Sequence, residues 1–299
     1  MRDLKNFSLG EWFLLRPLVG FLKQVRNDIK QHYFLKKHPS ALAPFLSKMK
    51  RLKNKNIVLI VAFNSSWVID KLLYMITHYI TDVTFIICDN SNKKEARIEI
   101  EKICKEHHVA YFPLPKNPEK HPCRSHGIAL NWIFFNIIKN IEPKIFAFID
   151  HDLMPFRKIK LEEELANQPF YGHFCRSDWG WNLWAGYSMF DYSLLKNLKV
   201  NFNNDRPNGL DTGGRNWKYL YKHYDKSKLH FAKVEKRTLL SHPNNPGEIQ
   251  VSVLDDKWLH LSGVTSNIEM FTPKIGFYDD LFREIKGGKE FSDFLTMGR

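Results

Sequence analysis

Residues 145–152 read IFAFIDHD, an uninterrupted apolar run followed directly by Asp150, His151 and Asp152. An apolar run rich in aromatic and β-branched residues is typical of a strand that is buried on both faces. Carboxylates at positions i and i+2 just past such a strand can reach one cation if the chain turns there. A hard divalent ion with oxygen ligands can then link them to a diphosphate. Solvated acids and turns also produce the Asp-x-Asp pattern, so the pattern alone is weak evidence. The hypothesis of a metal site rests on the position of the pattern at the end of a buried strand.

The sequence before this strand alternates between apolar runs and helical patterns. The predicted elements are a strand at 57–63 (IVLIVAF), a helix at 67–80, a strand at 83–88 (VTFIIC), a helix at 93–107, a strand at 109–112, a helix at 125–140 and the strand at 145–149. Strand-then-helix units in a row predict an α/β fold with a parallel, doubly wound sheet. Ligands of such sheets bind at the carboxyl ends of the strands. Beyond residue 160 the periodicity weakens, and only 249–254 is strand-like.

Composition and missing motifs exclude several classes of protein. Hydrophobic residues make up 43% and aromatic residues 14% of the 299 residues, which argues against disordered and fibrous chains. No G-x-G-x-x-G follows the first strand and no P-loop motif occurs, so dinucleotide and P-loop binding lose their best support. The apolar stretch at 13–22 is broken by Arg16 and Pro17, so no membrane-spanning helix is predicted. The four cysteines form no C-x-x-C pair and no signal peptide is recognised, which predicts reduced thiols and a cytoplasmic location.

The positive charge is concentrated in residues 1–56, which carry +10 of the total +13. Apolar residues recur there at spacings of three and four, at Leu15, Leu18, Leu22, Val25 and Ile29. Basic residues follow a seven-residue step on another face, at Arg16, Lys23 and Lys30. The pattern predicts a basic amphipathic helix, similar to segments that lie in the headgroup region of an anionic membrane. The alternative is that its apolar stripe packs on the main domain. Nucleic acid is not an expected partner, because the aromatic residues lie on an apolar face and not among base-contacting polar groups.

The order of these motifs resembles the GT-A glycosyltransferases, most closely the family 2-like group. The resemblance covers residues 55–155 well and 156–270 loosely. It implies a Rossmann-like GT-A sheet and a metal-dependent transferase that moves a sugar from a nucleotide-sugar donor, expected to be a UDP-sugar, to the hydroxyl of a saccharide acceptor. The implied cofactor is Mn²⁺ or Mg²⁺. If the chain behaves as family 2 enzymes do, the anomeric carbon inverts in one displacement.

The resemblance also assigns roles to residues of the donor side. The first strand's end (Ala62, Phe63, Asn64), the Asp-Asn-x-Ser after the second strand (Asp89, Asn90) and the small-residue helix Ser125-His126-Gly127-Ile128-Ala129-Leu130-Asn131 look like the family's nucleotide site. Donor-binding residues are accordingly expected at Ala62, Phe63, Asn64, Asp89, Asn90, Arg124, Asn131 and Asp150. The metal ligands implied are Asp150, Asp152 and a late histidine, His260. Each of these residues also has a purely structural interpretation.

The acceptor side is expected in the looser half of the resemblance. Trp179, Trp181 and Trp184 could stack on a sugar, because indole faces suit the apolar patches of carbohydrates. Ordinary core packing is the alternative for each. Asp211, in the sequence Gly209-Leu210-Asp211-Thr212-Gly213-Gly214, lies where the family places its catalytic carboxylate, although the usual acidic pair is absent. Asp178 and Asp205 are rivals for this role.

The sequence thus predicts a basic helical extension at 1–54, a GT-A-like domain at 55–275 and a C-terminal tail at 276–299. Acceptors at the inner face of the membrane, such as a lipid-linked saccharide, would suit the basic helix. Two other functions remain open. A nucleotidyltransferase also holds metal with two carboxylates on an α/β sheet, and a non-catalytic basic protein that binds membrane or nucleic acid would use the acids only to end strands.

Overall fold

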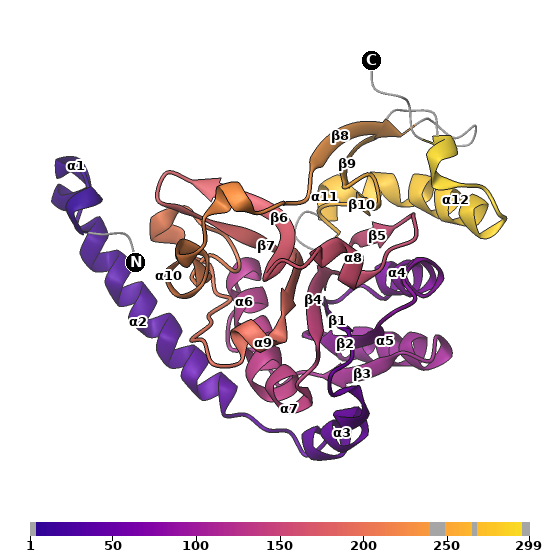
Figure 1. The fold of residues 1–299 in the computed structure, drawn as a ribbon, viewed down its shortest axis with the longest axis horizontal. Helices are drawn as coiled ribbons and strands as arrows, with labels where there is room; N and C mark the ends of the chain where they lie inside the picture. Colours follow the sequence, from indigo (N-terminus) through magenta and orange to yellow (C-terminus); the bar gives the residue numbers. More distant parts are fainter. Residues whose placement is uncertain (1–3, 240–248, 265–267, 295–299) are drawn as a thin grey trace.

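The structure is a computed structural model and describes residues 4–239, 249–264 and 268–294 (Figure 1). Its central sheet has the strand order β3-β2-β1-β4-β7-β6. These strands are β1 (Ile57–Ala62), β2 (Thr84–Asp89), β3 (Ala110–Pro113), β4 (Ile145–Asp150), β6 (Phe170–Ser177) and β7 (Gly180–Asp191). Strands β1 to β4 are parallel, and β7 and β6 extend the sheet in antiparallel pairing. The predicted α/β fold with a parallel-rich sheet is confirmed.

Helices cover both faces of this sheet, which is why β1 is apolar throughout. Along β1, Val58, Ile60 and Ala62 belong to one core, and the intervening Ile57, Leu59 and Val61 belong to the other. The first core includes side chains of α4 (Ser66–Tyr79) and α5 (Lys94–Glu106). The second includes the continuous helical run of α6 (Pro122–Ile133), the π-helical η3 (Phe134–Ile138) and α7 (Lys139–Ile141). Alternating side chains of one strand thereby fill both layers.

A second sheet has the strand order β5-β10-β9-β8 and lies beside the first (Figure 1). Its strands are β5 (Leu153–Pro155), β8 (Val234–Leu239), β9 (Ile249–Leu254) and β10 (Trp258–His260). The predicted strand at 249–254 is present as β9. Strand β5 begins directly after Asp152 and pairs with β10 so that Leu153 lies opposite His260. This pairing brings His260 next to Asp152, far away in the sequence.

The C-terminal region packs into the core, contrary to the tail expected at 276–299. It contains α11 (Ile268–Phe271), η7 (Thr272–Lys274), α12 (Ile275–Lys286) and η8 (Phe291–Phe294). Phe277, Tyr278, Leu281 and Phe282 of α12 are at most 4% exposed and belong to the same core as α4. The three- and four-residue spacing of these apolar side chains makes α12 amphipathic, which explains why it docks. Residues 295–299 lie outside the described residues.

Apart from the strands β6 and β7, the chain between β5 and β8 forms short elements joined by loops. They are α8 (Leu161–Leu165), α9 (Tyr192–Leu195), η4 (Arg206–Asn208), α10 (Asn216–Tyr219), η5 (Tyr221–His223) and η6 (Lys226–Lys228). The loop at 202–215 crosses α6 at Gly127. A Cβ at Gly127 would stand 2.9 Å from both the Asn203 Cα and the Phe202 carbonyl oxygen, so glycine is required for this close crossing.

The N-terminal region is helical, as predicted. It contains η1 (Leu4–Asn6), α1 (Leu9–Phe13), α2 (Arg16–Leu35), α3 (Leu42–Met49) and η2 (Lys50–Leu52). Helix α2 lies along the body near α6, and α1 extends beyond it (Figure 1). The contacts of α2 with the body are mainly polar: the Gln31 Oε1 accepts hydrogen bonds from Asn131 and Asn203. Phe34, near the end of α2, is fully buried.

The apolar stripe of α2 faces solvent, so the interpretation in which it packs on the main domain is wrong. Leu15, Leu18, Leu22 and Ile29 are each more than half exposed, and Val25 is 38% exposed. Trp12 and Phe13 of α1 continue this exposed surface. No described helix combines the length and the apolar character needed to cross a membrane. The stripe is therefore an apolar surface that no described residues of the chain bury.

Candidate active site

Asp150 and Asp152 lie at the carboxyl end of β4, in the middle of the central sheet. Asp150 is in register with Val61 near the end of β1, and Ala62 is in register with Asp89 at the end of β2. The strand ends that were predicted to form the site therefore meet at one edge. The Asp150 side chain is 24% exposed and the Asp152 side chain 11% exposed. A ligand at this edge can reach the first carboxylate more readily than the second.

Asp150 faces the first turns of α6 and the strand β7. The His126 Nε2 lies 3.5 Å from the Asp150 Oδ1. On β7, a Cβ at Gly186 would stand 2.5 Å from the Asp150 Oδ2. Burial raises the pKa of the Asp150 carboxyl, which His126 counteracts, and the Asp152 carboxylate raises it further. The negative charge of Asp150 is therefore only partly compensated by the described residues around it, and a bound cation would stabilise it.

Asp152 is paired with His260 of β10. The His260 Nε2 lies 3.5 Å from the Asp152 Oδ1, and the His260 Nδ1 lies 3.1 Å from the Ser262 Oγ. Burial disfavours the charged form of both side chains, but their mutual attraction is stronger. Asp152 therefore raises the pKa of His260, and His260 lowers the pKa of Asp152. The indole of Trp184 packs on His260, with ring centroids 4.8 Å apart. The structure thus gathers Asp150, Asp152, His260 and Trp184, all named from the sequence.

His151 was given no role by the sequence analysis, and His126 was named only as part of the small-residue helix that looks like the nucleotide site. The Phe63 backbone N–H donates a hydrogen bond of 3.3 Å to the His151 Nδ1. Burial lowers the pKa of His151, which favours the neutral ring that can accept this bond. His151 thereby ties the loop after β1 to the end of β4. The signal that could have identified His126 is its place in the first turns of a helix that begins beside the strand ends.

The donor-side polar residues at the ends of β1 and β2 mainly bind one another. Asp89 is fully buried and accepts hydrogen bonds of 2.8 Å from the Ser91 N–H and the Tyr111 hydroxyl. The Asn64 Oδ1 accepts bonds from the backbone N–H groups of residues 92 and 93. Asn90 donates to the Ser125 Oγ at 3.0 Å. These side chains fix the loops at the edge of the site, and a role in donor binding remains a proposal for each of them.

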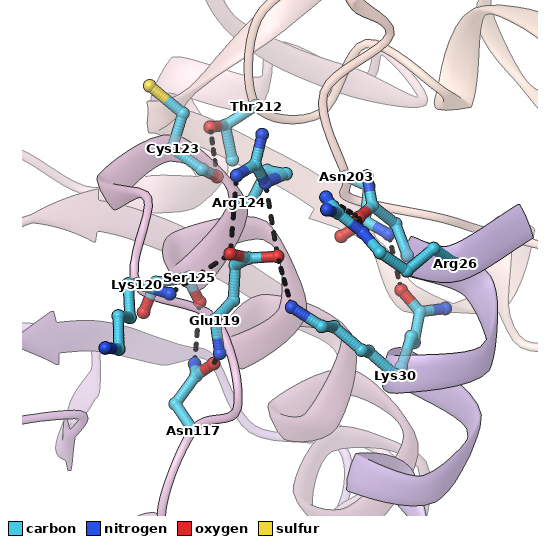
Figure 2. Close-up of polar contacts among 12 residues, drawn as sticks. Arg26, Lys30, Asn117, Glu119, Lys120, Cys123, Arg124, Ser125, Asn203 and Thr212 are labelled. Carbon is cyan, nitrogen blue, oxygen red and sulfur yellow. Dashed lines mark hydrogen bonds and ion pairs between the residues drawn. The ribbon is translucent and has the colours of Figure 1, made fainter. Parts of the chain in front are cut away.

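Arg124 and Asn131 of α6 bond other segments of the chain. Figure 2 shows Arg124 beside Glu119, with Lys30 of α2 on the other side of the same carboxylate. The Arg124 Nε lies 3.2 Å and the Lys30 Nζ 3.4 Å from the Glu119 Oε2. Asn131 is fully buried, and its Oδ1 accepts a hydrogen bond from the Phe202 N–H at 2.8 Å. Both residues thus join α6 to α2 or to the loop at 202–215, and a role in donor binding stays a proposal for each of them.

Asp211 is exposed on the loop that crosses the start of α6. Burial raises the pKa of the Cys123 thiol, and the nearby Asp211 carboxylate raises it further. Cys123 and His126 are three residues apart on α6 and therefore lie on the same face. Asp211 and Asp150 thus both lie near this face of the helix. Of the rivals, Asp178 is exposed, whereas Asp205 is 3% exposed and accepts a 2.6 Å hydrogen bond from the Asn208 amide.

The three tryptophans occupy different environments. Trp181 is 5% exposed and lies among Phe170, Phe174, Trp217, Tyr221 and Phe231. Its indole belongs to the core and is not available for stacking on a sugar. Trp179 is 37% exposed, and Trp184 is half-buried beside His260. Trp184 is therefore the tryptophan best placed to contact a ligand at Asp150.

The oxygen ligands at the end of β4 fit a hard divalent cation. Asp150 and Asp152 supply carboxylates, and the absence of a Cβ at Gly186 lets the Trp184 ring and the Asp150 carboxylate pack closely against β7. Among the described residues there is no cluster of three or more His, Cys, Asp or Glu side chains that could hold a metal ion by itself. Mg²⁺ in phosphate-transfer sites is held by one or two carboxylates together with substrate phosphates, so two protein ligands are sufficient.

We expect Gly186→Ala to reduce turnover by roughly 10²-fold, because a misplacement of about 1 Å at a reacting centre has this effect. The new methyl group would collide with the Trp184 ring and displace the Asp150 carboxylate. Turnover and melting temperature should be measured on one preparation. Gly20→Ala is the matched control, since nothing lies within 4 Å of its added Cβ. Normal turnover in Gly186→Ala would show that the Asp150 position does not matter.

Comparison with known proteins gives structural similarities only. No family model and no curated protein matches the sequence. The chain is similar to S. aureus TarS, with a TM-score of 0.35 and 17% identity over 50% of this chain and 30% of that one. It is also similar to the mannosyltransferase PcManGT from Pyrobaculum calidifontis in complex with GDP-Man and Mn²⁺, with a TM-score of 0.35 and 11% identity over 57% of each chain.

A third similar structure is glucosyl-3-phosphoglycerate synthase from Mycobacterium tuberculosis in complex with Mn²⁺ and UDP-glucose. Its TM-score is 0.32, with 15% identity over 54% of this chain and 63% of that one. The chain therefore spans less than two thirds of each of these three proteins. Two of the three were solved with a sugar nucleotide and Mn²⁺.

Proposed function

We propose that the chain is a glycosyltransferase of the GT-A type, which transfers a sugar from a nucleotide-sugar donor to an acceptor hydroxyl. One observation carries this proposal: Asp150 and Asp152 stand at the carboxyl end of the central strand β4, where ligands of open α/β sheets bind. Both carboxylates are substantially buried, and His126 and His260 are directed at them from other elements. If Asp150 and Asp152 only ended the strand, they would not need histidine partners from other elements.

Asp150 and Asp152 would hold a divalent cation, Mn²⁺ or Mg²⁺, with His260 beside Asp152. When bound, the cation supplies neutralisation of the charge on the diphosphate leaving group. The start of α6 is placed to contribute, because the side chain of its N-cap residue, His121, does not bond the first turn. The N–H groups at a helix N-terminus are suited to diphosphate oxygens. His126 would orient Asp150 from the same turns of the helix.

Asp211 is our candidate for the general base. It is exposed, lies near the same face of α6 as His126, and would accept the proton of the acceptor hydroxyl as the sugar bond forms. A base that acts on the acceptor corresponds to inversion at the anomeric carbon. The half-buried Trp184, next to His260, would contact the sugar through its exposed ring surface.

Nucleotide-sugar binding tests the proposal directly. UDP-, GDP- and dTDP-sugars should be screened with Mn²⁺ for an increase in melting temperature, because a bound ligand stabilises the folded state by mass action. We expect one nucleotide class, with UDP-sugars foremost, to stabilise the chain only when Mn²⁺ is present. Release of nucleoside diphosphate identifies a glycosyltransferase, whereas release of pyrophosphate identifies a nucleotidyltransferase. The absence of any Mn²⁺-dependent nucleotide binding would favour a non-catalytic function.

We further propose that α1 and α2 bind the surface of an anionic membrane. The support is the exposed apolar stripe of α2, continued by Trp12 and Phe13, together with the exposed Arg16 and Lys23 of the same helix. Apolar side chains and basic residues on one helix are the combination that binds anionic bilayers. The acceptor would then be a glycan or lipid-linked saccharide at that surface.

The double variant Leu18→Glu/Leu22→Glu should bind anionic vesicles at least ~10-fold more weakly than the wild type. Each leucine contributes about 1 kcal/mol or more on burial, and about 1.4 kcal/mol is tenfold in affinity. These leucines are 52% and 57% exposed, so the fold should survive, whereas deletion of α2 would remove the buried Phe34. Vesicle sedimentation at two salt concentrations is the measurement. Ile98→Glu, at an exposed position on α5, is the control, and equal sedimentation of all three proteins would contradict a membrane role for α2.

A further inference from the structure

A narrow crevice lies between α2, the start of α6 and the two ends of the loop at 202–215. It measures about 180 Å³ up to its open mouth, and its interior has room for about one water-sized group, about 10 Å³. Its lining consists of Asn27, Arg124, Ile128, Asn203, Asn204 and Arg215. Arg124 and His126 are two positions apart on α6, so the crevice and Asp150 lie on different sides of this helix.

Three hydrogen-bond donors of the lining are buried without a hydrogen bond, and one of them, the Arg124 Nε, lies 3.2 Å from the Glu119 Oε2 in an ion pair. The Asn204 Nδ2 and the Arg215 Nε have no hydrogen-bond partner among the described residues. Asn204 is 7% exposed and Arg215 is 9% exposed. A buried donor without a partner is costly, and most such groups in proteins bind water or a ligand. Both atoms are donors, so the group that satisfies them must accept hydrogen bonds.

The charges around the crevice favour an anion. Arg215 forms an ion pair with Asp28 of α2, and Glu119 is shared by Arg124 and Lys30. Figure 2 shows Lys30 and Arg124 on either side of Glu119. Three cations, Arg124, Lys30 and Arg215, thus lie around two carboxylates. Although burial opposes it, Arg124 and Lys30 lower the pKa of Glu119, so both carboxylates are already engaged with cations.

We propose that this crevice binds an oxyanion of the phosphate class, with one oxygen between Asn204 and Arg215 and the remaining oxygens at the mouth, towards Arg124. The other lining amide, Asn203, is already engaged, since it donates to the Gln31 Oε1 at 2.6 Å and its Oδ1 accepts from Asn131. The site is separate from the proposed donor site and does not depend on the chemistry at Asp150.

The crevice is coupled to the loop that carries Asp211. The Arg215 N–H donates to the Asn203 carbonyl at 3.1 Å, and the Gly213 N–H donates to the Phe202 carbonyl at 2.7 Å. The two ends of the loop at 202–215 therefore both lie at the crevice. An anion bound to Asn204 and Arg215 would hold both ends of the loop in place. A phosphate of a soluble acceptor and the phosphate of a membrane lipid share the required chemistry.

Inorganic phosphate is the probe for the first experiment. The affinity of the full chain for phosphate should be measured by calorimetry at constant ionic strength set with NaCl. Asn204→Asp is nearly isosteric and places a carboxylate where the unsatisfied amide stood, so we expect phosphate binding at least ~10-fold weaker. Asn167→Asp adds the same charge at an exposed position and should bind phosphate as the wild type does. Arg215→Gln, checked for folding by its melting temperature, should also weaken binding.

Three results would overturn the proposal. The first is that the wild type shows no heat of phosphate binding beyond that seen with NaCl, which would mean that water fills the crevice. The second is an equal affinity for phosphate in Asn204→Asp and Asn167→Asp, and the third is competition between phosphate and the donor nucleotide. Vesicles of phosphatidylglycerol distinguish the two sources. For a lipid phosphate, Asn204→Asp also weakens vesicle binding relative to Asn167→Asp. For a soluble acceptor, vesicle binding is equal in both variants and only phosphate binding falls.

Discussion

Replacement of Asp152 by asparagine is expected to abolish cation-dependent turnover while the fold survives. The carboxylate is 11% exposed at the end of β4 and faces His260, and asparagine keeps its shape and an oxygen that can accept from the histidine. What the variant loses is the charge that holds the cation. Charge stabilisation by a cation contributes several kcal/mol to a phosphate-leaving transition state, so we expect turnover to fall by ~10³-fold or more.

Turnover and Mn²⁺-dependent thermal stabilisation should be measured together for Asp152→Asn. We expect both to be lost, while the melting temperature without metal stays close to that of the wild type. Asp225→Asn is the matched control, because Asp225 is exposed at the start of η6 and its side chain accepts hydrogen bonds from its neighbour Ser227. If Asp152→Asn kept full turnover, the cation would not be held at the end of β4.

Asp211→Asn is expected to lower turnover by roughly 10² to 10⁴-fold and to leave donor affinity near normal. A general base acts on the acceptor hydroxyl and contacts neither the cation nor the diphosphate, so its loss affects the chemical step and not donor binding. The position supports this role: Asp211 is exposed near the first turns of α6, and neighbouring Gly213 has a φ of +90°, which permits the tight loop.

The alternative for Asp211 is that its side chain only orders the loop, since it hydrogen-bonds the Cys123 thiol at the start of α6. That role predicts a lower melting temperature with unchanged turnover of the folded protein, because an Asp that stabilises a turn has no part in the reaction. Asp178→Asn, at an exposed position before β7, is the control. If Asp178→Asn instead lost turnover at normal donor affinity, Asp178 would be the base.

The sequence alone was sufficient to predict the α/β sheet and the meeting of the strand ends at Asp89 and Asp150 at one edge of it. Local periodicity carries this information, because a strand buried on both faces must be apolar along its whole length, as residues 57–62 are. Asp-rich ends on such strands then mark the edge at which ligands bind. The helix at 16–35 was also predictable, because its apolar residues repeat with the period of a helix.

Contacts between distant segments could not be predicted from local patterns. The pairing of β5 with β10 places His260 beside Asp152, and the docking of α6 directs His126 at Asp150. On the same helix, Arg124 points into the crevice under α2, because successive side chains of a helix are about 100° apart and two positions therefore separate opposite sides. The motif by itself assigned Arg124 to the donor site, and this assignment stays a prediction.

The amphipathic helix α2 also shows what a local pattern leaves undetermined, namely which surface covers its apolar face. Its periodicity determined that one face is apolar, but the removal of apolar surface from water is favourable whether a protein core or a bilayer covers it. Only the tertiary structure decided that Gln31 and Phe34 contact the body while Leu18 and Leu22 face solvent. The physical reason is that the body presents Asn131 and Asn203 to α2, and these buried amides require hydrogen-bonding partners that an apolar stripe cannot supply.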